Sequence, residues 1–429
     1  MAFEAGLLLL ITFMILLIIG VPIAIAIAVS SLSIIVLNLP LDITMFTASQ
    51  KIVTSLNSFT LISIPLFIMS GIIMNNGGIA KRLIKFSMLL VGKIPGALAI
   101  TNAIGNGLFG SMSSSAIAAS TAIGGVLVPQ QIEAGYDKGY AAAANIASAP
   151  SGMIIPPSTA FIMYSLVSGA SISALFLGGY VVGAAWILIV SLICYVLAKK
   201  NKYPIVKVEQ SESKLKIIMD AVPSLLLIFI VIGGILTGFF TAIEASAVCV
   251  AYSLILSMVY KSISLKDFPN LFRQTIETSG TIMLLLATSS LMSFGMALNS
   301  IPAAVSNLVL GISANAFFTL LIINVIFLLV GCFMDVGPAI LIFTPIFLPI
   351  VQEIGIDPVH FGLFAIMNFS VGSITPPVGT GLYVGASVAK VKFETVIRPL
   401  MPFYIGILGL LFLITYFPDL FMWFPNLLG

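Results

Sequence analysis

Two ten-residue segments, VPQQIEAGYD at residues 128–137 and LPIVQEIGID at residues 348–357, decide the architecture of this chain. They share Pro, Glu, Gly and Asp at matching places, and the second segment begins 220 residues after the first. The Pro-Pro pair at residues 156–157 recurs at the same offset, at residues 376–377, as does the glycine four residues before it. Coincidence does not place so many helix-breaking residues at one spacing, so the sequence predicts an internal duplication.

The composition limits the class of protein. Hydrophobic residues make up 60% of the 429 residues and charged residues only 8%, whereas soluble domains carry about 25% charged residues. A soluble enzyme, a nucleic-acid-binding protein and a disordered scaffold are therefore excluded. Long apolar runs, in place of alternating ten-residue strands, indicate an all-α polytopic membrane protein. Three widely spaced cysteines in apolar runs are interpreted as core residues: Cys194, Cys249 and Cys332.

Apolar runs of about 20 residues predict the membrane crossings. They fall at residues 59–76, 138–170, 174–198, 217–239, 242–260, 275–298, 358–389 and 400–417. Lys and Arg collect on the cytoplasmic side of membrane proteins, and here they cluster at residues 81–93, 199–216, 261–273 and 390–398. We therefore place all four clusters inside.

Two further apolar stretches, residues 95–130 and 315–350, are interrupted by Gly, Ser, Asn and Pro. The crossings between successive basic clusters already return the chain to the cytoplasm, so each stretch must enter and leave on one side. The first is then a re-entrant hairpin from the cytoplasm, and the second a re-entrant hairpin from outside. Residues 299–314, which lack Lys and Arg, are interpreted as an external loop. Inverted repeats with equivalent interrupted segments indicate a secondary transporter.

The first apolar run, residues 5–37, is too long for one ordinary crossing and short for two. Gly20 and Pro22 lie in its middle, so it forms either one kinked helix or two short helices. Its counterpart in the second copy, residues 217–260, contains two crossings. The duplication therefore favours a hairpin of two short helices with the N-terminus outside.

Each Pro-Pro pair lies near the middle of a predicted crossing. Proline removes a backbone donor and disfavours helix at the preceding residue, and unsatisfied backbone groups at membrane depth occur where they line a cavity. The freed carbonyls are oxygen ligands of the kind that sodium takes, and the N-termini of the half-helices attract carboxylates. The alternative is a simple proline kink in a packed bundle.

The first hairpin contains Asn102, Asn106 and the run SMSSS at residues 111–115, whose hydroxyls can bind a cation or a carboxylate. Small-residue helix packing is the alternative for any one of these serines. Ser115 aligns with Asp335 in the second copy. An Asp at the centre of a membrane helix costs about 2.5–3.5 kcal/mol, so Asp335 is expected to have a polar partner or ligand.

Two other polar residues near apolar runs are given no transport role. Glu244 lies in a short turn, where a capping or scaffold role is expected. His360 flanks the start of a predicted crossing and is interpreted as a polar interface residue.

Together these motifs resemble one known family. The hairpins, the breaks IIPPS (residues 154–158) and SITPPVG (residues 373–379) and the turn at residues 241–245 are similar to the large membrane subunit of TRAP (tripartite ATP-independent periplasmic) transporters. The similarity covers nearly the whole chain. The run from Ser111 to Pro157 looks closest to the sialic-acid branch, although the C4-dicarboxylate branch shares most of the signals. Ala242 departs from the family pattern, which often has Pro in this turn.

The resemblance implies a sodium-coupled importer of a carboxylate solute in the bacterial inner membrane, working by an elevator mechanism. Sodium would be the coupling ion, without an organic cofactor. The implied partners are a small four-helix membrane subunit and a soluble periplasmic substrate-binding protein, and no nucleic acid is expected.

Carried over position by position, the resemblance also implies two sodium sites with a solute site between them. The first sodium site would use Asn106, Gly110, Ser113, Gly152 and Pro156. The second would use Gly331, Met334, Thr375, Pro376 and Gly379. The solute would lie near Ser114, Ser115, Ser158, Thr159 and Asp335.

An elevator requires a fixed scaffold and a mobile transport domain. We expect the scaffold to comprise residues 1–93 and 217–314, and the transport domain residues 94–198 and 315–429, with 199–216 as a basic cytoplasmic linker. Each transport part would hold a hairpin (95–130 or 315–350) and a broken helix (138–170 or 358–389).

Three alternatives compete with this hypothesis. One is a stand-alone sodium/dicarboxylate symporter that needs no binding protein. Another is an intramembrane hydrolase using a serine of residues 111–115, for which His360 would be the only histidine. The third is a channel.

Overall fold

The computed structural model describes residues 2–205, 213–312 and 315–427, and all regular elements within these ranges are helices. By length and composition, eight described segments can cross a membrane: Phe59–Asn76, Ile172–Lys200, Lys214–Ile235, Ala242–Val259, Leu265–Leu298, Ala316–Phe333, Val336–Glu353 and Phe393–Tyr416. A ninth crossing is the pair Lys138–Ile154 and Thr159–Ser168, which bends by 48° at its break. The prediction of an all-α polytopic protein is confirmed.

The first half of the chain forms α1 (Ala2–Ile18), α2 (Ile23–Ile35), α3 (Leu41–Leu56), α4 (Ser63–Asn76), α5 (Ile79–Val91), α6 (Ala97–Ser113), α7 (Ala116–Glu133), α8 (Lys138–Ser148), α9 (Ser151–Ile154), α10 (Thr159–Ser168) and α11 (Ile172–Lys200). The second half forms α12 (Lys214–Leu236), α13 (Ala242–Val259), α14 (Phe268–Leu298), α15 (Ile301–Ile312), α16 (Ala316–Phe333), α17 (Val336–Glu353), α18 (Pro358–Gly372), α19 (Thr380–Val388), α20 (Phe393–Tyr416) and α21 (Asp419–Asn426). Part of the predicted basic linker, residues 206–212 with Lys207, lies outside the described residues.

The first apolar run forms two short helices, α1 and α2, which pack against each other. Gly20 has φ +86°, a value that favours glycine, and Pro22 directly precedes α2. This pair reverses the chain between the two helices, so the hairpin alternative is the correct one.

The two hairpins occupy equivalent places in the two copies. The first consists of α6 and α7 joined at Ser114–Ser115, and the second of α16 and α17 joined at Met334–Asp335. The residue numbers of the two tips therefore differ by 220, which is also the offset between the two Pro-Pro pairs. Both pairs, Pro156-Pro157 and Pro376-Pro377, have cis peptide bonds and lie between helix ends.

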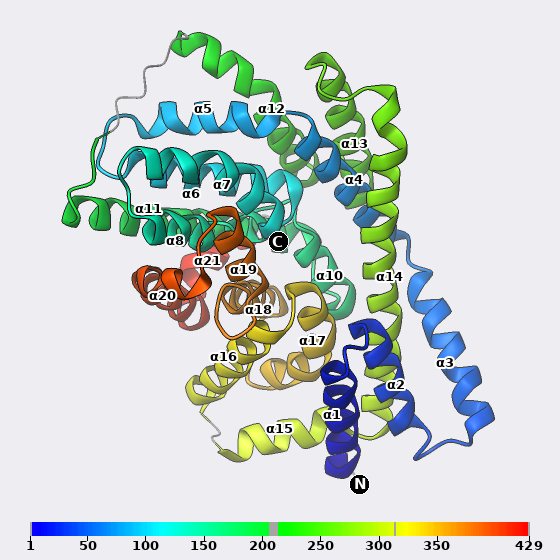
Figure 1. Ribbon diagram of the computed structural model, residues 1–429. Coiled ribbons are helices and arrows are strands. Elements are labelled where there is room, and N and C mark those ends of the chain that lie inside the picture. Colours follow the sequence, from blue (N-terminus) through cyan, green and yellow to red (C-terminus); the bar gives the residue numbers. More distant parts are fainter. Residues whose placement is uncertain (1, 206–212, 313–314, 428–429) are drawn as a thin grey trace.

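Short helices precede both hairpins, and they lie at opposite ends of the molecule. Figure 1 shows α5 at the top of the view and α15 at the bottom, while the long helix α14 runs between the two levels. This arrangement is what inverted repeats require. The prediction that residues 299–314 form a loop is wrong, because residues 301–312 form helix α15. It has 12 residues and is therefore too short to suggest a crossing.

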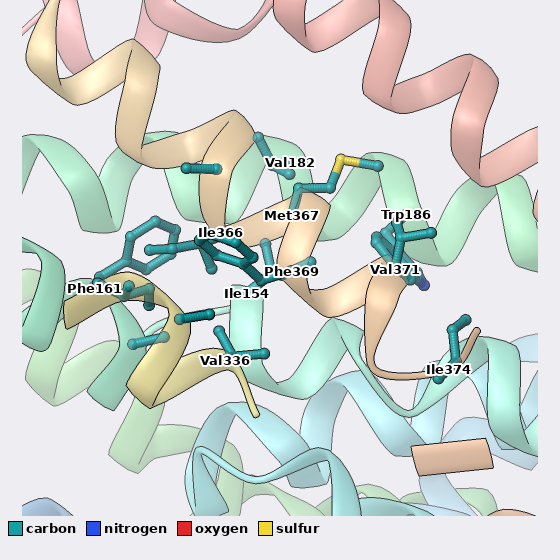
Figure 2. Close-up of a cluster of buried hydrophobic side chains, with 14 of the residues drawn as sticks. Ile154, Phe161, Val182, Trp186, Val336, Ile366, Met367, Phe369, Val371 and Ile374 are labelled. Atoms are coloured by element: carbon teal, nitrogen blue, oxygen red, sulfur yellow. The ribbon is translucent and has the colours of Figure 1, made fainter. Parts of the chain in front are cut away.

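The two copies interlock around the breaks. Helix α19, which follows the second break, packs against α7 of the first hairpin, and α10, which follows the first break, packs against α17 of the second. Figure 2 shows the buried side chains where the copies meet, with Ile154 and Phe161 from the first copy beside Val336 and Phe369 from the second. Each break is therefore enclosed by elements of both copies.

Several single-residue predictions can now be compared with the structure. Glu244 forms a capping box with Thr241 at the start of α13, so its capping role is confirmed. All three cysteines are buried and free, as expected of core residues. The interpretation of His360 as an interface residue is wrong. Its side chain is buried, and Nε2 lies 2.7 Å from the carbonyl oxygen of Ile414, because α18 is covered by α20.

Candidate solute and cation sites

The tip of the first hairpin is held in place by contacts with the first break. Ser114 adopts the left-handed conformation, with φ 50°, and its N–H donates to the carbonyl of Gly110 at 2.6 Å. Its hydroxyl donates to the carbonyl of Pro157 at 2.5 Å. The hydroxyl of Ser115 accepts a hydrogen bond from the N–H of Ala118 and caps α7. The tip is thus tied both to its own hairpin and to the break.

Glycines allow each hairpin to approach its break at backbone distance. A Cβ placed on Gly110 would lie 2.2 Å from the Cα of Gly152, and one on Gly372 would lie 2.4 Å from the Cα of Gly331. Any other residue at these positions would force the two backbones apart. Gly110, Gly152 and Gly331, which the family resemblance assigns to sodium sites, thus have a packing role, and their sodium role stays a prediction.

The second tip carries the carboxylate of Asp335. Its Oδ1 accepts a hydrogen bond of 2.8 Å from the hydroxyl of Thr380, the first residue of α19. Asp335 precedes α17 and is exposed. It therefore does not lie within a membrane helix, and the insertion cost of about 2.5–3.5 kcal/mol for an Asp at a helix centre does not apply to it. Thr380 was missed. The available signal was Thr159, which likewise begins the half-helix after its own break.

A cavity of about 140 Å³ lies between the two tips. Its lining consists of Ser114, Ser115, Ala116, Ile117, Met153, Asp335, Val336, Gly337, Ser373, Thr380 and Gly381. Three predicted solute residues, Ser114, Ser115 and Asp335, therefore come together. Among the described residues, the lining does not include the other two, Ser158 and Thr159. Ser373 and Thr380 line the cavity but were not predicted.

Ser158 and Thr159 have a structural place next to the cavity. The hydroxyl of Ser158 donates to the carbonyl of Met153 and accepts from the N–H of Phe161, so it caps α10. Thr159 is half-buried and is the first residue of that helix. Since Met153 itself lines the cavity, these two residues set the position of one wall.

Three helices begin at this cavity. Residues 115–117 are the cap and first residues of α7, residues 335–337 those of α17, and residues 380–381 the first residues of α19. The unpaired N–H groups of a helix N-terminus and the helix dipole favour an anion. The cavity is therefore suited to a carboxylate, although the charge of Asp335 opposes one beside it.

The predicted first cation site has a buried oxygen with no partner among the described residues. The amide N–H₂ of Asn106 donates to Ser148 Oγ at 2.7 Å and to Asn145 Oδ1 at 3.1 Å. Its own Oδ1 is buried and receives no hydrogen bond. Such an oxygen is costly to bury, and a cation would satisfy it. The carbonyl of Pro156, in contrast, already accepts from the hydroxyl of Tyr180 at 2.8 Å.

The predicted second cation site brings several carbonyls around Gly379, which has φ 27°. Its N–H donates to the carbonyl of Cys332 at 3.0 Å, and a Cβ there would lie 2.6 Å from the carbonyl oxygen of Thr375. Nearby, Asn368 donates to Asn324 Oδ1 at 2.6 Å, while its own Oδ1 is buried without a partner in the described chain. Asn368 was missed; its signal was an amide within a strongly apolar helix.

In both copies, an amide oxygen that is unsatisfied among the described residues thus lies on a helix that packs against a break or leads to one. Neutral oxygens at such a break are the ligands that transporters use for sodium. Among the described residues there is no group of three or more His, Cys, Asp or Glu side chains that could hold a metal ion. The available ligands are therefore neutral and hard, which fits a monovalent cation better than a transition metal.

A polytopic helical fold with inverted hairpins, whose tips enclose a cavity at three helix N-termini, defines a membrane transporter. The family model for "Tripartite ATP-independent periplasmic transporter, DctM component" matches residues 10–420. The chain belongs to this family and is an inner-membrane transport permease.

The chain is similar over most of its length to several proteins. It is 44% identical to the protein YgiK of Salmonella typhimurium, over 91% of this chain and 90% of that protein. It is 33% identical to the sialic acid TRAP transporter large permease protein SiaM of Vibrio cholerae, over 89% of each chain. It is 32% identical to the C4-dicarboxylate TRAP transporter large permease protein DctM of Rhodobacter capsulatus, over 91% of each.

A solved structure has a similar fold at low sequence identity. The YdaH transporter of Alcanivorax borkumensis, described as having an unusual topology, superposes with a TM-score of 0.66 over 90% of this chain and 91% of that one. The two sequences are 14% identical. The likeness therefore concerns the fold alone.

Proposed function

We propose that this chain is the large permease of a sodium-coupled importer for a carboxylate solute, and that the solute binds in the cavity between the two hairpin tips. The observation that supports this proposal is the convergence of three helix N-termini, those of α7, α17 and α19, on one cavity. A solute carboxylate gains from all three dipoles and can accept from the hydroxyl of Ser115, whose oxygen accepts from the N–H of Ala118.

Asp335 then selects for a hydrogen-bond donor on the solute. A second carboxylate beside it would be repelled, whereas a solute hydroxyl or a protonated group would donate to it. Thr380 orients the Asp335 carboxylate by its hydrogen bond. The solute would therefore lie with its carboxylate towards the helix N-termini and a donor towards Asp335.

Sodium coupling is proposed from the two unsatisfied amide oxygens. Asn106 lies against the first break, and Asn368 on the helix that leads to the second. The first site would use Asn106 and carbonyls of the Gly110–Gly152 approach, and the second Asn368 with carbonyls around Thr375 and Gly379. Sodium binding at both sites would hold each hairpin to its break and so complete the cavity.

The size of the cavity bears on the solute. At about 140 Å³ it is smaller than the 300–1,000 Å³ typical of pockets for drug-sized ligands. This favours a small carboxylic acid that carries a hydrogen-bond donor over sialic acid, which the sequence resemblance had favoured. Relatives of this chain are named for both solutes.

The mechanism that we propose is an elevator. The transport domain would comprise residues 94–198 and 315–429, which include both hairpins and both breaks, and would carry the cavity across the membrane against a scaffold of residues 1–93 and 217–314. The tripartite name of the family supports two partners, a small membrane subunit and a periplasmic binding protein that delivers the solute.

Uptake into proteoliposomes tests this function. The permease, its small subunit and candidate binding proteins are reconstituted with an inward sodium gradient, and a panel of labelled acids is supplied. We expect uptake of one acid that requires sodium and the binding protein. Sodium-dependent uptake by the permease alone would favour the stand-alone symporter, and uptake that ignores the sodium gradient would contradict coupling.

A further inference from the structure

A second cavity, of about 310 Å³, lies between α5 and α12, far from the hairpin tips in the fold. Figure 1 shows these two helices next to each other at the top of the molecule. The cavity is lined by Gly78, Lys81, Arg82, Lys85, Ile217 and Asp220. Lys81, Arg82 and Asp220 thus share one lining, in which these two cations outnumber the carboxylate, so the cavity suits an anion.

Local structure fixes the position of the central cation. The guanidinium of Arg82 lies 3.5 Å from the ring centroid of Tyr260, and one of its N–H groups donates to the carbonyl of Gly78 at 3.1 Å. The hydroxyl of Tyr260 in turn donates to the carbonyl of Asp220 at 3.2 Å. A guanidinium has five N–H donors, so a stacked Arg82 can still present a fork to a phosphate.

The cavity lies at the level where a membrane crossing begins. Ile217 and Asp220 are within the first two turns of α12, a helix able to cross a membrane. The same helix exposes Met219 and Phe229, which are 64% and 69% accessible. A basic cavity at the start of a membrane helix that exposes apolar side chains suits a ligand with a phosphate and acyl chains. The basic residues 81–93 place this end at the cytoplasmic face.

We propose that the cavity between α5 and α12 binds the phosphate of an anionic phospholipid headgroup from the inner leaflet. Arg82 and Lys81 hold the phosphate oxygens, and Asp220 accepts from a hydroxyl of the headgroup. Basic pockets between helices on the cytoplasmic side are a known form of lipid recognition. Because α5 connects α4 to the first hairpin, the bound lipid joins that connection to α12.

Thermal unfolding of the purified permease in neutral detergent tests this proposal without transport. Phosphatidylglycerol is the probe, phosphatidylcholine the reference lipid and sodium phosphate the soluble anion. We expect phosphatidylglycerol to raise the unfolding midpoint by about 2 °C or more over phosphatidylcholine. The double variant Lys81→Gln/Arg82→Gln loses this increment, whereas Lys266→Gln, another exposed cation in a basic cluster, keeps it.

Comparing increments within each variant separates lipid binding from any loss of stability caused by removing the Arg82–Tyr260 stack. Native mass spectrometry provides a second measure, with at least about tenfold less retained phosphatidylglycerol expected in the double variant. An unchanged increment in that variant would overturn the proposal. Sodium phosphate that reproduces the full increment would also overturn it, by assigning the cavity to a soluble anion.

Discussion

The hydroxyl of Thr380 donates a 2.8 Å hydrogen bond to Oδ1 of Asp335, and this bond joins the tip of the second hairpin to the first residue of α19. Both residues line the cavity that we assign to the solute. Because a single side-chain hydrogen bond is weak, the tip can stay closed over a solute and can also open to release it. The pair is therefore the most direct point at which to test the solute site.

We expect Asp335→Asn to lower sodium-dependent uptake by about 10- to 100-fold, since hydrogen bonds to charged groups contribute about 1.5–3 kcal/mol. Thr380→Val, which removes the orienting bond but keeps the charge, should lower uptake by about fivefold. Asp42→Asn on the exposed helix α3 is the matched control. Initial rates normalised to folded protein give the comparison, and undiminished transport by Asp335→Asn would remove this residue from the solute site.

The close approach of Gly110 and Gly152 predicts a strong effect of one added methyl group. Gly110→Ala and Gly152→Ala place a Cβ 2.2–2.4 Å from the opposite Cα, and overpacking of this kind costs about 1–3 kcal/mol. Gly125→Ala, a helical position with nothing within 4 Å, should be neutral or stabilising. The measurement is the thermal unfolding midpoint of each variant in the presence of sodium, which should fall for Gly110→Ala and Gly152→Ala only. Equal midpoints for all three variants would argue against the contact.

The unsatisfied oxygens predict where sodium acts. Asn368→Ala should raise the sodium concentration needed for half-maximal thermal stabilisation by at least about fivefold, because one ligand is lost. Asn76→Ala is the control, since this exposed amide donates only to the carbonyl of Ile72 in its own helix. The titration is run with sodium against potassium at constant ionic strength. Equal sodium dependence in both variants would exclude Asn368 as a ligand.

The buried His360 distinguishes a transporter from a Ser-His hydrolase. Its ring contacts the carbonyl of Ile414 and the ring of Phe364, which is a structural role. His360→Gln should lower the free energy of unfolding by about 1 kcal/mol and leave uptake per folded molecule within about twofold. Complete loss of activity with a folded protein would revive the catalytic alternative.

The inverted arrangement predicts opposite labelling of the segments before the hairpins. In a variant whose buried cysteines are replaced, a cysteine at Lys93 should react with an impermeant reagent only from the cytoplasm, and one at Ser300 only from outside. The basic clusters and the opposite positions of α5 and α15 (Figure 1) motivate this expectation. Labelling of both positions from one side would contradict the inversion.

The hairpins and the breaks could be predicted from the sequence because both depend on residues that interrupt apolar helices. Glycine, proline and short polar residues interrupt apolar runs at a fixed offset, and the structure places both tips and both Pro-Pro pairs at that offset. Helices α5 and α15 were not predicted, because a search for crossings finds runs of about 20 apolar residues. These helices have only 13 and 12 residues, so they do not produce such a run.

Contacts between the copies could not be predicted. The offset relates Ser115 to Asp335 but does not say that both line one cavity, or that Asp335 pairs with Thr380. Likewise, the lack of a partner for Asn368 Oδ1 within the described part of the chain depends on how α18 packs on α16. Such facts need the tertiary arrangement, which a single sequence does not contain.

The interlocking of α7 with α19 and of α10 with α17 has a consequence for the durability of the protein. Each tip is bonded to its own copy and is also covered by a helix of the other copy, so each half supplies part of the other's cavity wall. A protease cut between Lys200 and Lys214 would break the backbone without separating the pieces. The two fragments should stay together through purification, because the helix contacts between the halves do not depend on the cut backbone segment.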